Sequence, residues 1–323
     1  MNRQRLFAAL GIAAFAFGVF LLYRVFKRYD FREIISILGT ADGGSIGLAL
    51  SLAMCSYTCV AALEVLAVTY TGQAVPLPRI VSTGIAAVSI GRSIGFAALS
   101  SGAVRYRMYG RAGLHLFSVG AIVVFSGVSV ALGFAVVGGG LLLWRGDLLA
   151  PFLGLSPAGI RNLAIGLLIA ATAYILLCAL RRKPVRLRRN CLRIPRLRLA
   201  VGQVILSSLN LTCIGGVLYI ALRSFTDVGY PLAAMLYFGS DLAAVIGHVP
   251  GGWGVLEYIV TSVLAGGQVL SGVIVFRATY YLIPLGAGLL IFLADEWRHR
   301  RIAQTPSRGR HIPAADHPGG GRP

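Results

Sequence analysis

Long apolar runs separated by short polar stretches recur along almost the whole chain. A helix needs about 20 residues to cross the hydrocarbon core of a bilayer. Runs that suit this length lie at residues 6–23, 44–70, 114–144, 160–180, 199–222 and 267–293. The first is interpreted as a span and not as a cleaved signal peptide, because no clear cleavage site follows it and more spans come after it. The pattern predicts an all-α fold, a polytopic transmembrane helical bundle with about six crossings.

Two further apolar stretches are interrupted near their middle. Residues 80–104 contain the motif SIGRSIGF, with Arg92 between two glycines, and residues 231–264 contain the motif GHVPGGWGVLE. Glycine is a poor helix former and proline lacks the amide donor of a helix, so both stretches should break. A straight span over 80–104 would place the Arg92 guanidinium near mid-membrane, at a cost of at least about 2.5–3.5 kcal/mol. The sequence therefore favours two re-entrant or broken-helix hairpins, with a full crossing by 80–104 as the open alternative.

The formal net charge of +19 does not indicate nucleic-acid binding, because the basic residues concentrate beside apolar runs, above all at residues 181–198. Such clusters orient membrane proteins and attract anionic lipid headgroups. If residues 80–104 and 231–264 are both re-entrant, the two termini and both basic linkers fall on the cytoplasmic side. Hairpins that enter from opposite sides are typical of transporters with inverted repeats, whose site lies where the broken helices meet. The sequence itself shows no convincing internal repeat.

The polar segments complete the expected domain plan. Residues 24–42 are more polar, with alternating apolar positions, and predict a short amphipathic helix at the membrane interface. Residues 1–294 are expected to form one transmembrane domain, and residues 295–323 a disordered basic cytoplasmic tail rich in Arg, Gly and Pro. The five cysteines form no CxxC pair, so neither a disulfide framework nor a metal site is indicated.

Ionisable residues inside the apolar stretches are the candidates for function, because charge is costly there. A planar guanidinium donates two parallel hydrogen bonds to a phosphate. On this ground the candidate headgroup contacts are Arg92, Arg105, Arg107 and Arg277. Arg277 needs an acidic partner, and Glu257 and Asp241 are both open choices. The alternatives for these carboxylates are a structural ion pair that holds the hairpin, contact with a cationic headgroup, or carriage of protons that drive transport.

The second break supplies the remaining candidates. Gly251 and Gly252 shape the interruption, and His248 either titrates near neutral pH or serves as a hydrogen-bonded structural residue. Trp253 anchors the hairpin at the interface or stacks on a ligand. Tyr280 is expected to pack, with its hydroxyl facing the proposed cavity.

Four motifs also resemble one known family. HVPGGWGVLE at 248–257 and FRATYYLIP at 276–284 resemble the late signature of the lysylphosphatidylglycerol synthase transmembrane-region family. YDFREIISIL at 29–38 and GFAALSSGAVRYRMYGRAGL at 95–114 look like its first loop and its central region rich in Gly and Arg. The resemblance covers roughly residues 1–295. The family includes the flippase part of the multiple-peptide-resistance factor and many stand-alone membrane proteins.

This resemblance implies transmembrane helices with re-entrant elements and the handling of phospholipid. In the two-part members a cytosolic domain makes an aminoacylated lipid and the membrane part moves it across the bilayer. Only about 30 polar residues follow Leu293 here, so synthase activity is expected to be absent. The chain departs from the family at Gly91, Arg92 and Ser93, where relatives tend to carry Asn, which puts the identity of the lipid in doubt.

The leading hypothesis is an inner-membrane translocase for an anionic or aminoacylated phospholipid, not an enzyme, with no cofactor or metal. One rival is an intramembrane enzyme acting on lipid headgroups, although no HExxH, GxSxG or paired-Asp pattern occurs. A second rival is a membrane scaffold that recruits partners through residues 181–198. The sequence is also compatible with a homo-oligomer.

Overall fold

The structure, a computed structural model, describes residues 39, 42–94, 97–148, 154–180, 185–187, 190–192, 194–247, 249–264, 266 and 268–304. The span predicted at 6–23, almost all of the amphipathic segment at 24–42, and His248 lie outside the described residues. The last helix continues through Gln304, past the domain boundary expected at residue 294, and the rest of the predicted tail lies outside the described part.

Five helical segments of the described chain are long and apolar enough to cross a membrane: Gly43–Thr71, Leu116–Leu148, Pro157–Leu180, Leu197–Arg223 and Val269–His299. They correspond to all the predicted crossings except the one at 6–23, so the polytopic all-α prediction is confirmed. The first, third and fourth of these segments are α3 (Gly43–Thr71), α9 (Pro157–Leu180) and α10 (Leu197–Arg223). The only strands among the described residues are β1 (Val185–Leu187) and β2 (Asn190–Leu192), a short antiparallel pair in the basic linker.

The other two spans each contain a π-helical turn. In one, α6 (Leu116–Gly133) passes through a π segment, Phe134–Gly138, into α7 (Gly139–Arg145) and a short 3-10 turn, Gly146–Leu148. In the other, α13 (Val269–Arg277) passes through a π segment, Ala278–Leu282, into α14 (Ile283–Gln304). Each π turn widens the helix locally, and such turns are frequent at functional sites.

Residues 80–104 form a helical hairpin and do not cross the membrane as one straight helix. It consists of α4 (Leu77–Ile94) and α5 (Ala97–Gly110). The open ends lie together, because Nη2 of Arg79 donates to the carbonyl oxygen of Met108 at 2.8 Å. Near the tip the helices are so close that a Cβ on Gly91 would lie 2.8 Å from the Cβ of Ser101. The re-entrant alternative is therefore the one that the structure adopts.

The second hairpin consists of α11 (Tyr230–Ile246), a 3-10 turn at Pro250–Gly252, and α12 (Val255–Val263). The turn requires glycine because Gly251, Gly252 and Gly254 have φ angles of 63°, 60° and 89°, in the left-handed region that side chains disfavour. The helix break predicted at this motif is confirmed.

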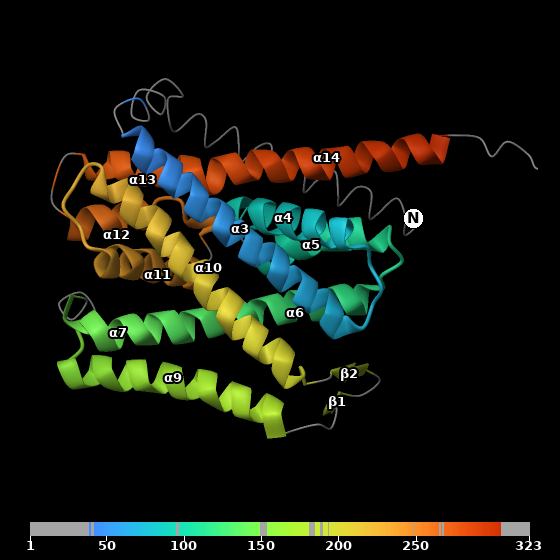
Figure 1. Cartoon of the computed structure of the whole chain (residues 1–323), viewed down its shortest axis with the longest axis horizontal. Helices are drawn as coiled ribbons and strands as arrows, with labels where there is room; N and C mark the ends of the chain where they lie inside the picture. Colours follow the sequence, from blue (N-terminus) through green and yellow to red (C-terminus); the bar gives the residue numbers. More distant parts are fainter. Residues whose placement is uncertain are drawn as a thin grey trace, which may run out of the picture.

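The two hairpins occupy opposite halves of the molecule and meet at their tips (Figure 1). A Cβ on Gly251 would lie 3.0 Å from the carbonyl oxygen of Ser93, so the second turn abuts the end of α4. The central helices α3 and α10 pack against each other and run in opposite directions (Figure 1). A long helix, a hairpin and a helix with a π turn thus follow one another twice, with inverted direction. This is the inverted-repeat topology expected from the sequence pattern.

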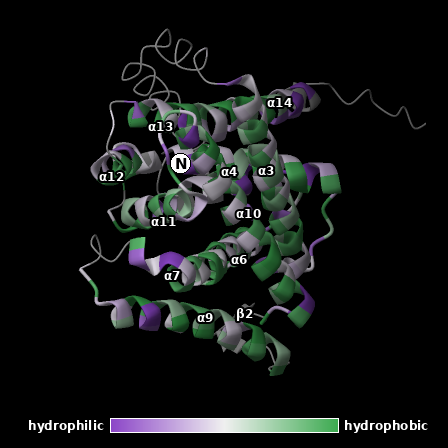
Figure 2. Ribbon diagram, turned by 60° about the vertical axis from the view of Figure 1, so that its left-hand side comes forward, coloured by the Kyte–Doolittle hydropathy of each residue, from purple (hydrophilic) through white to green (hydrophobic). Residues whose placement is uncertain are grey.

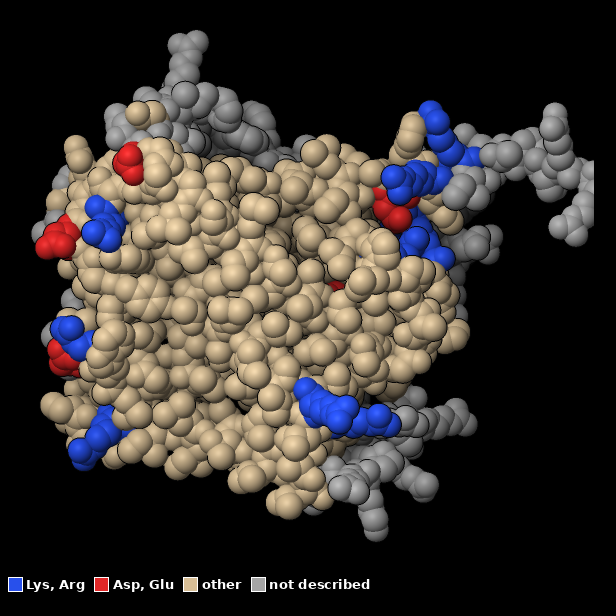
Figure 3. Space-filling view, in the orientation of Figure 1, with Lys and Arg blue, Asp and Glu red and all other residues tan. Residues whose placement is uncertain are grey.

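On the face drawn in Figure 3, the charged side chains gather toward the two ends of the bundle, and a broad band almost without charge lies between them. Hydrophobic residues cover much of the helix surfaces between the ends (Figure 2). Exposed apolar side chains on the spans include Met54, Leu176, Ile205 and Leu290. Such a band fits the hydrocarbon core of a bilayer.

The two ends differ in charge. The end at which α14 finishes holds, among the described side chains, Arg79, Arg107, Arg111, Arg196, Arg198, Arg298 and Arg301, against the acidic Asp295 and Glu296. The opposite end holds Arg145, Arg161 and Arg223 against Asp42, Asp147 and Asp227. The positive-inside rule places the first end in the cytoplasm. The α4–α5 hairpin therefore enters from the cytoplasmic side, and the α11–α12 hairpin from the outer side.

Candidate functional site

Arg92 stands at the C-terminal end of α4, where the hairpin tips meet. Its Nη1 donates to Oη of Tyr280 at 2.8 Å, with a longer contact of 3.5 Å to Oη of Tyr237. The guanidinium carbon also lies 5.3 Å from the centre of the Tyr280 ring. The side chain is half-buried, and no carboxylate of the described residues forms an ion pair with it. The Arg92 charge is therefore held by neutral hydroxyl groups and an aromatic ring.

A chain of buried polar groups continues from Tyr280 into the central helices. Oη of Tyr280 and Oγ of Ser56 are 2.9 Å apart, and Oγ of Ser56 donates to Oδ1 of Asn210 at 2.6 Å. These residues join the first hairpin to the π turn, to α3 and to α10. Sequence reasoning identified Tyr280 but missed Ser56, Asn210 and Tyr237. The available signal was weak: single polar residues within apolar runs.

Asp241 lies on α11, on the second hairpin. Its side chain is half-buried and makes no hydrogen bond or ion pair with another described residue. It lies one helical turn beyond Tyr237, whose hydroxyl is 3.5 Å from Nη1 of Arg92. Along the same helix Leu242 and Val245 are 55% and 64% exposed. The carboxylate therefore lies between the buried polar chain and an exposed apolar surface of α11.

Arg277 pairs with Glu257 and not with Asp241. Nε of Arg277 is 3.1 Å from Oε1 of Glu257, and Nη2 is 3.2 Å from Oε2. Nη1 donates to the carbonyl oxygen of Gly251 at 2.9 Å, and Nη2 to that of Gly252 at 2.8 Å. The guanidinium lies between two aromatic rings, 4.4 Å from the centre of Trp253 and 4.7 Å from that of Tyr281. Arg277 thus binds the carbonyl groups that the broken helix leaves without helical donors.

Glu257 also begins the returning helix. Its Oε2 accepts a hydrogen bond from the amide of Gly254 at 2.9 Å, which satisfies a donor at the start of α12. One carboxylate therefore fixes both the Arg277 guanidinium and the helix start. Trp253 packs on Arg277 within this arrangement, and its expected roles at the interface or on a ligand stay predictions.

Arg105 is also held inside the protein. Its Nε and Nη2 donate to Oε1 and Oε2 of Glu64 at 2.9 and 2.7 Å, and Oη of Tyr109 donates to Oε1 of Glu64 at 3.0 Å. The Arg105 and Glu64 side chains are 3% and 2% exposed. Gly84 permits this pair, because a Cβ there would lie 2.8 Å from that of Glu64. The pair fastens the first hairpin to α3, and sequence analysis did not foresee it.

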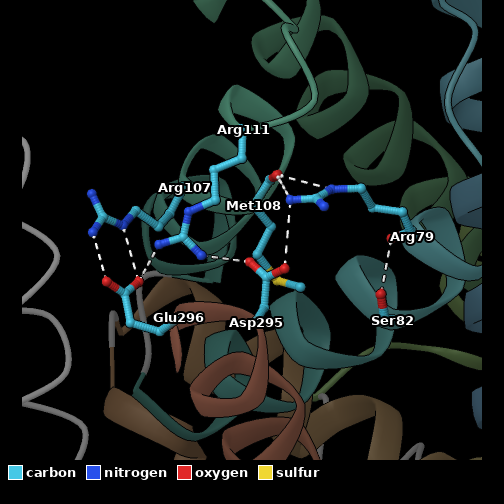
Figure 4. Close-up of polar contacts among 7 residues, drawn as sticks. All are labelled: Arg79, Ser82, Arg107, Met108, Arg111, Asp295 and Glu296. Carbon is cyan, nitrogen blue, oxygen red and sulfur yellow. Dashed lines mark hydrogen bonds and ion pairs between the residues drawn. The ribbon is translucent and has the colours of Figure 1, made fainter. Parts of the chain in front are cut away.

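Arg107 lies at the cytoplasmic end, away from the hairpin tips. Figure 4 shows it with Arg79 and Arg111 around two adjacent carboxylates of α14, Asp295 and Glu296. Nη2 of Arg107 is 2.9 Å from Oε1 of Glu296, and Arg111 pairs with both carboxylates. Arg79 is 3.5 Å from Asp295. We name these five residues the cytoplasmic clamp, since they bind the open end of the first hairpin to α14.

The structure therefore sorts the predicted site residues into separate places. At the hairpin tips it brings together Arg92, Asp241, Gly251, Gly252, Glu257, Arg277 and Tyr280. Arg105 lies in a buried pair with α3, and Arg107 lies in the cytoplasmic clamp. No group of three or more His, Cys, Asp and Glu side chains that could hold a metal ion occurs among the described residues.

These features define an integral membrane protein with two inverted halves and a charged centre where broken helices meet, an architecture known from transporters. The chain belongs to the lysylphosphatidylglycerol synthase transmembrane-region family, whose family model matches residues 9–288. It is 28% identical over 313 residues to the protein slr0712 of Synechocystis, covering 93% of this chain and 95% of that protein. It is 25% identical over 296 residues to the inner membrane protein YbhN of Escherichia coli, covering 89% and 92% respectively.

Proposed function

We propose that the protein is a translocase that carries the headgroup of a phospholipid across the inner membrane through the meeting point of the two hairpins. The observation that carries the proposal is Arg92, a half-buried guanidinium at the hairpin tips whose only described side-chain partners are tyrosines. A charge held at this depth without an ion-pair partner in contact costs stability, and such residues commonly mark a substrate path.

The surroundings of Arg92 suit a lipid better than a small solute. A lipid headgroup needs a polar path while its acyl chains stay in hydrocarbon. The tips of both hairpins carry exposed apolar side chains, Leu99 at 75% and Ile246 at 70% exposure, close in sequence to Arg92 and Asp241. The planar guanidinium of Arg92 matches the geometry of the lipid phosphate. Anionic and aminoacylated phospholipids both carry this phosphate.

The other arginines support the path and do not line it. The pairs Arg277–Glu257 and Arg105–Glu64 neutralise their own charges and tie one hairpin each to the bundle. The name of the E. coli relative supports the location in an inner membrane. We propose that the lipid is moved without chemical change, which distinguishes this function from that of an intramembrane enzyme.

The test is exchange of fluorescent phospholipids between leaflets of proteoliposomes. Arg92→Gln should lower the exchange rate by about tenfold or more, because a charged hydrogen bond to phosphate is lost, and Arg92→Lys should restore part of it. Arg161→Gln, at an exposed position of α9, should leave the rate unchanged. Mass spectrometry should recover the lipid intact.

Two results would overturn the proposal: exchange no faster than in vesicles without protein, or an Arg92→Gln rate equal to that of the native chain. A further variant, in which the arginines of residues 181–198 are neutralised, tests the scaffold hypothesis. If this variant alone loses its function in the cell while its lipid exchange persists, the scaffold hypothesis is favoured.

A further inference from the structure

We infer that the lipid taken by this site has a zwitterionic headgroup, with its phosphate at Arg92 and a single amino group at Asp241. The inference rests on the proposed function and narrows its substrate from phospholipids in general to amine-bearing phospholipids of no net charge, such as phosphatidylethanolamine. It depends on how the charges at the hairpin tips are distributed.

Most charges near the tips are cancelled within the protein. Arg277 is matched by Glu257 through two contacts, and Arg105 by Glu64 through three. Among the described residues at the tips, Arg92 and Asp241 are left, one of each sign. The site that remains for a ligand is therefore neutral as a whole but carries two separated charges.

These two charges do not neutralise each other by contact. Asp241 lies one helical turn beyond Tyr237 on α11, and the Tyr237 hydroxyl is 3.5 Å from Nη1 of Arg92, yet the described side chains of Asp241 and Arg92 form no ion pair and no hydrogen bond between them. An ionised carboxylate only accepts hydrogen bonds, whereas an ammonium group donates three. A buried or half-buried carboxylate without a donor is costly, so a ligand that supplies the donor gains that free energy.

Only some headgroups satisfy both residues. A headgroup with a phosphate alone would bind Arg92 but leave Asp241 unpaired and repelled by the added negative charge. A headgroup with additional positive charges would oppose Arg92 and add cations near Arg277. A phosphate joined to one ammonium group places one charge opposite each residue and leaves no excess.

The experiment compares three short-chain lipids labelled on an acyl chain in the same proteoliposome exchange assay. Phosphatidylethanolamine carries the ammonium, its N-acetylated form keeps the phosphate without it, and phosphatidylglycerol carries the phosphate alone. The native chain should exchange phosphatidylethanolamine about tenfold faster than either of the others, as expected for one charged hydrogen bond.

Asp241→Asn provides the decisive variant, because removing its charge leaves the site with a net positive charge. The preference should fall or reverse in favour of phosphatidylglycerol. The ratio of the two rates does not depend on how much variant folds, and Asp241→Glu should keep the native ratio. The matched control is Asp147→Asn, an exposed aspartate in the 3-10 turn that follows α7.

The outcomes separate the inference from the proposed function. No exchange of any lipid above protein-free vesicles would remove the proposed function. Equal exchange of the three lipids by the native chain would overturn the zwitterionic headgroup alone. A native preference that Asp241→Asn leaves unchanged would overturn the assignment of the amino group to Asp241.

Discussion

A single arginine can hold the break between the two helices of a re-entrant hairpin. Within the bilayer no water is available for the carbonyl groups that an interrupted helix leaves unpaired. Arg277 supplies donors to two of them, at Gly251 and Gly252, while its charge is balanced by Glu257. The guanidinium therefore donates the hydrogen bonds that water would donate to these carbonyl groups in a turn at a protein surface.

Glu257→Gln should destabilise the protein strongly. It leaves the buried Arg277 without a counter-charge, and breaking one partner of a buried pair costs about 3–5 kcal/mol. The thermal unfolding temperature in detergent should fall clearly. Asp147→Asn, which removes an exposed pair with Arg145 worth at most about 1 kcal/mol, is the control. Equal unfolding temperatures for the two variants would contradict the role assigned to Glu257.

Gly288 should tolerate no side chain. A Cβ at this position of α14 would collide with Oγ of Ser89 on α4, whereas a Cβ on Gly286 would meet nothing. Gly288→Ala should therefore lower the unfolding temperature, and Gly286→Ala should leave it unchanged or raise it, since alanine favours a helix by about 1 kcal/mol. Adding Ser89→Ala to Gly288→Ala should recover much of the loss. If Gly288→Ala left the unfolding temperature unchanged, α4 and α14 would be packed less tightly at this position than the structure indicates.

At the scale of elements, the first hairpin is fixed at two places to the last span, Val269–His299. Arg92 bonds to Tyr280 at its tip, and the cytoplasmic clamp joins its open end to Asp295 and Glu296. Three guanidinium groups around two carboxylates form a network, which contributes more than isolated surface pairs do. Polar contacts thus fix both the tip and the open end of the hairpin.

Replacing both acidic residues of the clamp, Asp295→Asn with Glu296→Gln, should loosen the open end of the hairpin. Peptides covering residues 77–82 and 105–111 should then exchange amide hydrogen for deuterium faster, while α3 stays protected. High salt should have a similar but weaker effect on the native chain, because partly exposed pairs are screened. Asp227→Asn, at an exposed outer position, is the control. Unchanged hydrogen–deuterium exchange in the double variant would mean that the cytoplasmic clamp does not stabilise the open end of the hairpin.

The sequence predicted elements well and their pairings poorly. Glycine and proline at 247–254 act through the local backbone, so the second break could be predicted from residues alone. The partner of Arg105 could not, because Glu64 lies on another helix and spacing within one helix says nothing of that contact. Asp241 and Glu257 were equal candidates for Arg277 for the same reason. Arg92 could be identified as a candidate because an arginine within an apolar run is visible in the sequence, whichever residues it contacts in the fold.

For the whole molecule, the fold predicts which loops share a side of the membrane. In a cysteine-free background, Gln73→Cys and Ala112→Cys should react with a membrane-impermeant thiol reagent only when the cytoplasmic face is accessible. Ser156→Cys and Ser224→Cys should react from the outer face. Reaction of positions 73 and 112 from opposite faces would contradict the hairpin and the inverted halves.

Self-association of the chain, with which the sequence is compatible, stays a prediction.

The π turn at Ala278–Leu282 has a consequence for the far end of its helix. A wide turn accommodates an extra residue, and each α-helical residue advances the rotation by about 100°. Because the wide turn absorbs that residue, deleting one residue here should close the turn to regular α geometry and keep Asp295 and Glu296 beside the arginines they bind, whereas the same deletion within α14 ahead of them would rotate both carboxylates away. The extra residue thus acts locally: it widens the helix at Tyr280, whose hydroxyl contacts Arg92 deep in the bilayer.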